Sequence, residues 1–514
     1  MGICSGCFNR RRPSVLLSRV GFKDIPFGFA SAEVESAESP SLLLEGFLDP
    51  GGVVPALLEG RKFLVLGPKG AGKSALGIHL AMLSETRHDV FVSLQFLGDL
   101  SYGTLGELIR DDIELELRYP KAWTWLLLLS ALDTLALDEG LLWEDPSTAL
   151  AAVKILRREG LLPVDNLSRL VGMSSNRRIE LSGWGVTLAS SSNQPRGRLS
   201  LGVLSEHLKQ VVASARTDST HIIVIDGLDD ILLSDNVQLH ALSGLILEAS
   251  RLNQYFRMNA TNVKIVVLCR TDIFERLPGP NQNKIRQDLA IEINWFDESG
   301  DPASSNLVQL VNLRANHYSS TIEDVFTQCF PEKIRGAPAL PRLLRLTRHT
   351  PRDFIQLLRH IQERTIGLCP RDKAIRAGVR AYAEKYFLPE LRNELQGALV
   401  LDEIDEVFRM LRQFHLRRFW QHEFEDFLQS RGRDQLAARL DTILSALFNS
   451  CAIGNSSRSE LDEPTVITSF KHRSAAASYN SHEQVVCHVA LSIALQLVHK
   501  RQLESKASKK KRKR

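Results

Sequence analysis

Residues 67–74 read GPKGAGKS and match the pattern G-x-x-x-x-G-K-[ST] at every fixed position. A short apolar run at 63–66 precedes this stretch, and helical apolar spacing resumes after it with Leu76, Leu80 and Leu83. The order of strand, glycine-rich loop and helix is the context in which this pattern binds phosphate. We therefore predict an α/β fold built around this loop.

Each residue type in the loop has a chemical reason. Glycines let the backbone wrap a phosphate with its amide hydrogens, and the N-terminus of the following helix adds a positive dipole. Lys73 would reach the β- and γ-phosphates of a nucleotide, and the Ser74 hydroxyl would bind Mg²⁺. ATP and Mg²⁺ are the predicted cofactors. The predicted cofactor-binding residues of the loop are Gly67, Pro68, Lys69, Gly70, Ala71, Gly72, Lys73, Ser74 and Ala75.

Four further segments have the composition of buried strands. They lie at 90–94, 222–225, 265–268 and 290–293, with helical patterns between them, which predicts a parallel sheet. About 125 residues separate the second strand from the third, more than a plain crossover needs. We therefore expect a P-loop NTPase sheet with a large, mostly helical insertion at about 101–200, including a hairpin at 179–188.

The C-terminal half changes its pattern twice. Residues 306–362 have helical spacing with proline-marked joints, and from 400 onward three helix faces precede short strands at 451–454 and 465–471 and a closing helix at 482–498. This order suggests a winged helix. The predicted organisation is an N-terminal extension at 1–20, a P-loop ATPase domain at 21–300, an α-helical lid at 301–388, a winged-helix-like domain at 389–499 and a disordered basic tail at 500–514.

The stretch HIIVIDGLDD at 221–230 is an apolar strand that ends in acid. Asp226 would lie at the carboxyl end of the sheet and hold Mg²⁺ through water, so Asp226 and Ser74 are the predicted metal-binding residues. Asp229 or Asp230 could orient the attacking water as a base. The alternative for these two is a solvated acidic loop that caps the next helix.

These motifs resemble a known class of proteins. GPKGAGKS with IVIDGLDD is similar to the ASCE division of P-loop ATPases, and the DGLDD spacing is similar to the NACHT branch of the STAND signal-transduction ATPases. The segments GFKDIPFG, PKGAGKSAL, DGLDDIL and TPRDFIQLLR also resemble a bacterial group of P-loop ATPases with a C-terminal winged helix, over about residues 21–498. AAA+ proteins usually carry Glu directly after the Mg²⁺ aspartate, whereas this chain has Gly227, so the base is not identified.

The resemblance implies two arginines that act on the nucleotide from other elements. Arg270, after the fourth strand, would point toward the γ-phosphate and joins Asp229 and Asp230 as a predicted catalytic residue; the alternative is an arginine paired with acid at a strand end. Arg286 lies where AAA+ neighbours donate an arginine finger, which requires a homo-oligomer.

Arg352 resembles the sensor 2 arginine of AAA+ lid domains and is predicted to bind the nucleotide. Its neighbours also explain the segment without a nucleotide, because Thr350 as N-cap, Pro351 at the first helical position and Asp353 would form a capping box. Both interpretations are compatible, since Arg352 is free at the second position.

The charge is unevenly distributed. The net charge is +4, but nine Lys/Arg and one Glu at 500–514 contribute +8, which leaves −4 for the rest of the chain. Residues 390–483 hold 11 basic and 15 acidic residues, a net charge of −4, which favours a protein-contact domain over the alternative, a winged helix that binds duplex DNA. The basic tail is expected to bind nucleic acid non-specifically.

The function predicted from these observations is an Mg²⁺-dependent ATPase that acts as a nucleotide-controlled conformational switch in bacterial signalling or defence. The alternatives are a DNA-associated AAA+-like motor or loader and an ATP-binding module without turnover. A protein partner is expected through the winged helix or the insertion. The longest apolar run, at 122–132, is shorter than the roughly 20 residues of a membrane helix, so no membrane partner and a cytoplasmic location are expected.

Overall fold

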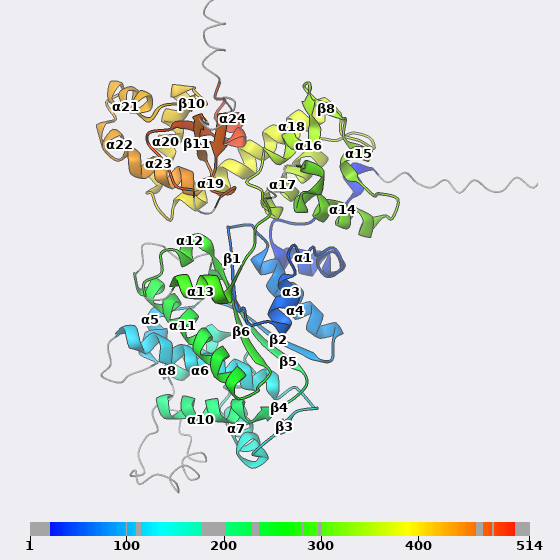
Figure 1. Cartoon of the computed structure of the whole chain (residues 1–514), viewed down its shortest axis with the longest axis vertical. Helices are drawn as coiled ribbons and strands as arrows, with labels where there is room; N and C mark the ends of the chain where they lie inside the picture. The colour runs from blue at the N-terminus through cyan, green and yellow to red at the C-terminus, as the bar shows by residue number, and fades with distance from the viewer. Residues whose placement is uncertain are drawn as a thin grey trace, which may run out of the picture.

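The computed structural model describes residues 21–98, 100–108, 115–176, 201–228, 236–279, 282–296, 301–458, 466–474 and 477–498. Figure 1 shows a sheet covered by helices and, beyond one end of that sheet, the helices of residues 301–388 beside the C-terminal elements. The segment at 301–388, predicted to be a lid, is called the lid below.

A five-stranded parallel sheet forms the centre of the first part. Its order is β2-β5-β6-β1-β7, and every pairing in it is parallel. The five predicted strand segments correspond to β1 (Leu64–Gly67), β2 (Val90–Phe96), β5 (Thr220–Asp226), β6 (Val263–Arg270) and β7 (Ala290–Glu292). The predicted parallel sheet is therefore confirmed, and it is compatible with a P-loop NTPase fold.

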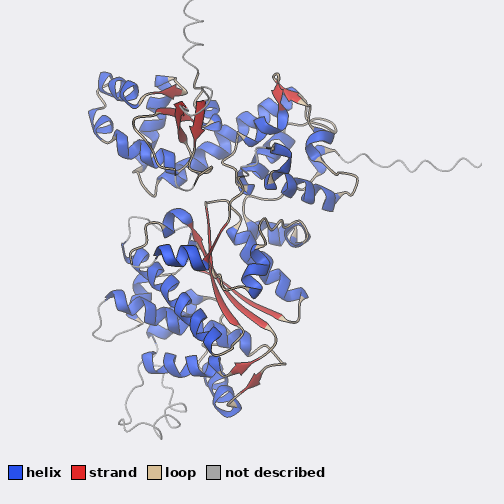
Figure 2. Cartoon of the chain, in the orientation of Figure 1, coloured by secondary structure: helices blue, strands red, loops and turns tan. Residues whose placement is uncertain are grey.

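Both faces of this sheet are buried, which explains why its strands are continuous apolar runs. Along β5, Ile222 and Val224 belong to one core and Ile223 and Ile225 to the other. Helix α4 (Lys73–Thr86) covers the first face, with α1 (Ala32–Glu38) and α2 (Pro40–Leu44) packed on it. Helices α6 (Leu115–Leu135) and α11 (Asn236–Met258) cover the second face (Figure 2).

The chain between β2 and β5 is mostly helical where it is described. Its elements are α5 (Tyr102–Glu107), α6, β3 (Leu142–Trp143), α7 (Pro146–Arg158), α8 (Leu167–Asn176), α10 (Leu201–Ala213) and β4 (Ala215–Arg216). The apolar run at 122–132 lies within α6, where Trp123 and Trp125 are fully buried. No helix in the described ranges has the length and apolarity needed to cross a membrane. The hairpin predicted at 179–188 lies outside the described residues.

The N-terminal segment contains short helices, and α3 (Val53–Glu59) follows α1 and α2. A buried ion pair joins this segment to the lid, because Arg314 Nη2 lies 2.6 Å from Glu35 Oε1. The lid contains α14 (Asn306–Tyr318), α15 (Val325–Cys329), the β8–β9 hairpin (Lys333–Ile334 and Ala337–Pro338), α16 (Ala339–Leu344), α17 (Pro351–Gln362) and α18 (Asp372–Tyr382).

Helical backbone continues from the lid into the C-terminal part. Helix α18 leads into a π-helical turn (Ala383–Phe387) and then into α19 (Leu388–Leu395) without a linker. The expected boundary between 388 and 389 therefore falls inside one helical stretch. Proline at 389 interrupts nothing there, because the first turn of a helix tolerates a residue without an amide hydrogen.

The C-terminal part combines helices with a four-stranded antiparallel sheet of order β10-β13-β11-β12. Its elements are α20 (Leu401–Phe414), β10 (Arg418–Phe419), α21 (Gln421–Ser430), α22 (Asp434–Ala438), α23 (Leu440–Asn449), β11 (Ile453–Arg458), β12 (Val466–Ser469), β13 (Gln484–Cys487) and α24 (Val489–Ala494). The closing helix predicted at 482–498 is wrong in its first half. Because Val485 and Cys487 are completely buried in β13, between β10 and β11, sheet pairing overrides the helical spacing.

Three histidines gather where the lid meets the C-terminal sheet. The rings of His349 and His472 stack with centroids 5.4 Å apart, and His488 Nε2 lies 3.3 Å from the Thr347 carbonyl oxygen. Burial lowers the pKa of His349 to about 4 and that of His488 to about 3, and it holds the pKa of His472 well below its usual range. All three are neutral at pH 7.

We expect acid to weaken this contact. Unfolded histidines take up protons near pH 6.5, whereas His349 and His488 take them up only near pH 4 or lower, so their contribution to stability is complete above about pH 6.5 and falls as the pH drops toward 4. The thermal unfolding temperature should fall over this window. His349→Asn keeps a residue that tolerates the left-handed backbone at this position (φ 54°) and should flatten the dependence. Equal slopes for the two proteins would contradict the assignment.

Candidate functional site

The stretch at 67–74 forms the turn between β1 and α4. Gly70 and Gly72 have φ angles of +81° and +94°, in the left-handed region that favours glycine. Gly72 is the N-cap of α4, so the amides of the first helical turn face the loop. The Trp295 indole donates a hydrogen bond of 2.9 Å to the Ala71 carbonyl and fixes the loop from the chain after β7.

Lys73 begins α4 and is only 4% exposed. Its ammonium donates to the carbonyl oxygens of Gly67 at 3.2 Å and Pro68 at 3.1 Å. Neutral carbonyls do not compensate a buried charge, which is costly to keep away from water. A phosphate anion bound in the loop would supply the compensating charge, so the residues present fit the phosphates of a nucleotide.

Asp226 ends β5 at the same edge of the sheet and is 3% exposed. Strand β6 lies between β5 and β1, so the carboxyl ends of the three strands are adjacent. Strand β1 leads into the loop, β6 ends at Arg270 and β5 ends at Asp226. The sheet thus brings the loop that carries Ser74 and the acid-ended strand to one edge. Asp229 and Asp230 lie outside the described residues.

Gly227 cannot be replaced by a larger residue without distortion. Its φ is +84°, and a Cβ atom built on it would lie 2.9 Å from the Leu97 amide nitrogen and 3.1 Å from that of Gly98. Backbone atoms cannot move aside as a flexible side chain can. The departure from the AAA+ pattern therefore has a steric reason, because no glutamate can occupy position 227 in this backbone.

We expect Gly227→Ala to destabilise the protein more than Gly432→Ala. Both positions have positive φ, which costs alanine about 1 kcal/mol, but Gly432 has nothing within 4 Å of its added Cβ. Gly227→Ala adds the collision with the backbone at 97–98 and should cost at least about twice as much. Chemical unfolding of both variants beside the parent measures the difference. Equal losses would show that the backbone at 97–98 yields freely.

Arg270 ends β6 and is 7% exposed. Its guanidinium bonds Asp272 twice, from Nε to Oδ1 at 3.0 Å and from Nη2 to Oδ2 at 2.7 Å. Burial raises the pKa of the Asp272 carboxyl, but Arg270 and nearby Lys73 outweigh it, so the pKa is lowered. The structure shows the strand-end ion pair that was the alternative interpretation; a contact of Arg270 with a γ-phosphate stays a prediction.

Arg286 lies on α13 (Gln282–Leu289) and is engaged within its own chain. Nε lies 2.7 Å from Glu292 Oε1 and Nη1 lies 3.2 Å from Glu275 Oε1. The hydrogen bond to Glu292 contributes most to raising the pKa of this guanidinium. An arginine finger would first have to leave these two carboxylates.

Arg352 lies at the start of α17 and packs against the loop. Its backbone amide donates to the Gly70 carbonyl at 3.4 Å, and a Cβ on Gly70 would lie 3.2 Å from the Arg352 Cβ. The Thr350 hydroxyl caps α17 by accepting from the Asp353 amide at 3.3 Å. The predicted capping box is only half formed, because the Asp353 carboxylate is taken by Arg348 and Tyr386.

Two neighbouring cavities lie where the loop, the N-terminal segment and the lid meet. One of about 90 Å³ is lined by Lys73, Ser74 and Arg352, among others. The other, of about 50 Å³, has apolar walls that include Phe47 and Leu310, and the two cavities share lining residues. A ligand with a phosphate end and a flat apolar end matches this pair of cavities.

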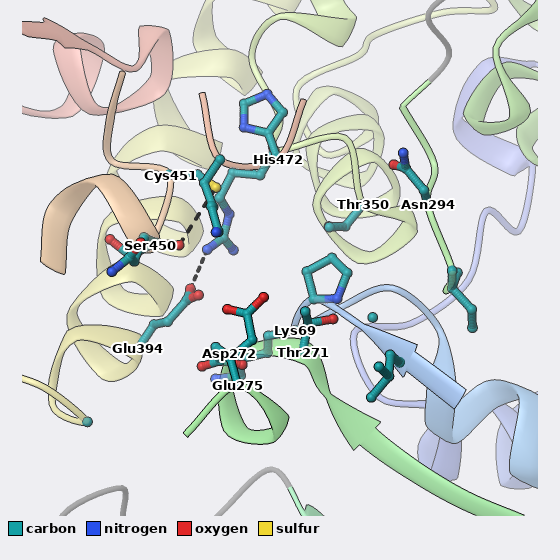
Figure 3. A pocket seen from close by; sticks show the side chains of 18 of the residues that line it. Lys69, Thr271, Asp272, Glu275, Asn294, Thr350, Glu394, Ser450, Cys451 and His472 are labelled. Atoms are coloured by element: carbon teal, nitrogen blue, oxygen red, sulfur yellow. Dashed lines mark hydrogen bonds and ion pairs between the residues drawn. The ribbon is translucent and has the colours of Figure 1, made fainter. Parts of the chain in front are cut away.

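A third cavity, of about 250 Å³, lies between the first residues of the loop and the C-terminal elements. Figure 3 shows Lys69 and Asp272 on one side of it, and Glu394, Ser450 and His472 on the other. Its walls combine these polar and charged side chains with apolar ones such as Leu66 and Leu395.

Sequence reasoning missed several residues around the loop. Glu390 and Glu394 lie on α19, 320 residues away along the chain, and the carboxylate of Glu390 reaches Lys69 at 2.9 Å. Trp295 and Arg314 also contact or line the site. No motif marks these positions, because ordinary amphipathic helices and strand ends contain the same residue types.

The fold and the site define a mixed α/β protein with a glycine-rich loop at the carboxyl edge of a parallel sheet. No known protein-family model matches the chain. Over 147 residues, 28% of this chain, it is 24% identical to a putative transposon gamma-delta 80.3 kDa protein of Escherichia coli, and this match spans 20% of that protein. Among solved structures, the Aeropyrum pernix ORC1 protein in complex with DNA aligns over 92% of this chain and 94% of its own, with 14% identity and a TM-score of 0.34.

Proposed function

We propose that the protein binds and hydrolyses ATP with Mg²⁺ and acts as a nucleotide-controlled conformational switch. The observation that carries this proposal is the buried Lys73 ammonium inside a loop with two left-handed glycines, where its hydrogen bonds within the described residues go to the neutral carbonyls of Gly67 and Pro68. A polyphosphate is the ligand that this loop geometry and this charge fit best.

The two cavities beside the loop would hold different parts of the nucleotide. The phosphates would lie with Lys73, Ser74 and Arg352, where the cations and the helix N-terminus provide positive potential. The base would lie in the apolar cavity next to it, against Phe47 and Leu310. Apolar walls with a charged end are the usual composition of such a site.

Hydrolysis requires a metal ion and a positioned water. Ser74 and Asp226 are the residues that would hold Mg²⁺, which neutralises charge on the phosphate oxygens when bound. Asp229 or Asp230 would orient the water, since Gly227 has no room for a side chain. For Arg270 to stabilise the transferred phosphoryl group, its guanidinium would have to turn away from Asp272.

Lys73→Ala should weaken ATP binding about 10- to 100-fold, because charge-assisted hydrogen bonds to the phosphates are lost. Lys62→Ala, which replaces an exposed lysine just before β1, is the matched control and should bind ATP as the parent does.

Asp226→Asn should retain ATP but slow Mg²⁺-dependent phosphate release about 10- to 100-fold. Calorimetry and phosphate release measure these effects. An unchanged ATP affinity of Lys73→Ala would contradict the proposed ATP site. If the parent binds ATP but releases no phosphate, the alternative of an ATP-binding module without turnover is favoured.

For the C-terminal part, we propose a winged-helix-like domain that contacts protein. The order α20, β10, α21, α23, β11 and β12 supports the winged helix. Helix α23, which would enter a DNA groove, contains no Lys or Arg. Ion pairs also occupy several surface arginines of this domain: Arg392 with Asp405, Arg409 and Arg433 with Glu406, and Arg439 with Glu403. Phosphates would have to compete with these carboxylates for the arginines, which weighs against the DNA motor or loader.

If DNA is bound, the tail at 500–514 should be responsible. Its local charge of +8 is the densest positive segment of the chain, and it lies outside the described residues. Deleting it should remove most DNA retention at physiological salt and flatten the dependence of log affinity on log salt by about 0.9 for each lost phosphate contact. Fluorescence anisotropy of a labelled duplex measures both. An unchanged affinity and slope would make the motor or loader the leading function.

A further inference from the structure

Helix α19 places two carboxylates over the nucleotide side of the molecule. Glu390 and Glu394 are four residues apart and therefore lie on the same face of the helix. Glu390 Oε1 lies 2.9 Å from Lys69 Nζ and 3.7 Å from Arg352 Nη1. Glu394 Oε2 lies 2.5 Å from Arg348 Nη1.

The Glu390 contact (Glu390 with Lys69 and Arg352) connects both sides of the phosphate loop. Arg352 lines the 90 Å³ cavity, and Lys69 lines the 250 Å³ cavity under the C-terminal elements. The side chains of Lys69 and Glu390 are only 20% and 18% exposed, so water screens this ion pair less than a surface pair. A negative charge of the protein thus already occupies cations that lie beside the phosphate loop.

A bound polyphosphate would compete with this carboxylate. It would attract the guanidinium of Arg352, whose contact with Glu390 is loose at 3.7 Å, and it would repel the carboxylate directly. Ligand binding and the docking of α19 therefore oppose each other, and by linkage each weakens the other to the same extent.

The surroundings of α19 leave space on the side of the phosphate loop. There a cavity of about 250 Å³, rather than packed side chains, lies between the loop and the C-terminal elements, whereas Leu391 and Leu395 of the same helix belong to the core that the lid shares with the C-terminal part. A π-helical turn precedes α19, and such turns mark irregular points in a helix. The partly exposed Glu390 and the irregular backbone before it both lie within residues 383–390.

We propose that Glu390 is an internal competitor of the nucleotide phosphates: docked on Lys69 and Arg352 it holds α19 and the C-terminal domain against the loop, and bound nucleotide releases them. This regulation rests on the proposed ATP site. In this proposal, α19 couples nucleotide binding at the loop to the position of the C-terminal domain.

The test compares the full-length parent with Glu390→Gln, which removes the charge but keeps the shape. Calorimetry with Mg²⁺ and AMP-PNP, a non-hydrolysable ATP analogue, should give about five- to tenfold tighter binding for Glu390→Gln. The advantage should shrink between about 0.1 M salt and about 1 M salt, where the Debye length falls from about 10 Å to about 3 Å. The control is Asp405→Asn on α20, which breaks the ion pair of Asp405 with Arg392 of α19, away from the loop. This variant should bind AMP-PNP as the parent does.

Hydrogen exchange of the amides at 388–395 gives a second, structural readout. In the parent, Mg²⁺ and AMP-PNP should speed their exchange, whereas in Glu390→Gln exchange should already be fast without the analogue. Equal affinities together with exchange that ignores the analogue would overturn the role of Glu390 and leave the ATP site standing. If neither protein binds the analogue, the proposed function itself fails. Binding by Glu390→Gln alone would be the strongest support.

Discussion

Burial of both faces of the parallel sheet is the constraint on which the rest of this molecule depends. Because α4 covers one face and α6 with α11 the other, the strands can carry few polar side chains along their length. The polar residues of β5 and β6 that serve the site therefore lie at the carboxyl ends, as Asp226 and Arg270 do. The phosphate loop follows β1 at the same edge, so one packing requirement assembles the site.

A second constraint is the charge of Arg348, buried between the lid and α19. Its guanidinium pairs with Asp353 at 2.9 Å and with Glu394 at 2.5 Å, and Tyr386 donates to Asp353 at 3.0 Å. Burial raises the pKa of Asp353, but Arg348 outweighs it, so the pKa is lowered and this carboxylate stays ionised. Removing one partner of such a buried group typically costs about 3–5 kcal/mol, so α17 and the base of α19 are firmly joined.

These two constraints leave the phosphate loop between a rigid sheet and a lid that is tied to the C-terminal part. Arg352 joins the lid to the loop through the hydrogen bond from its amide to the Gly70 carbonyl, and the lid continues as helix into α19. A change in charge at the loop can therefore act on the C-terminal part without a separate relay.

The sequence alone determined the sheet and the loop. Buried parallel strands leave continuous apolar runs, and a phosphate loop needs glycines, Lys73 and Ser74 at fixed spacing, so both are visible in a linear pattern. Tertiary structure decided the rest. The strand β13 replaced half of a predicted helix because burial between two strands outweighed local spacing. Which acidic residues pair with Arg270 and Arg286 also depended on the fold, which brings Asp272 to the first and Glu275 and Glu292 to the second. The contact of Glu390 with Lys69 joins residues 321 positions apart, and no local pattern records which distant helix a buried interface brings to a loop.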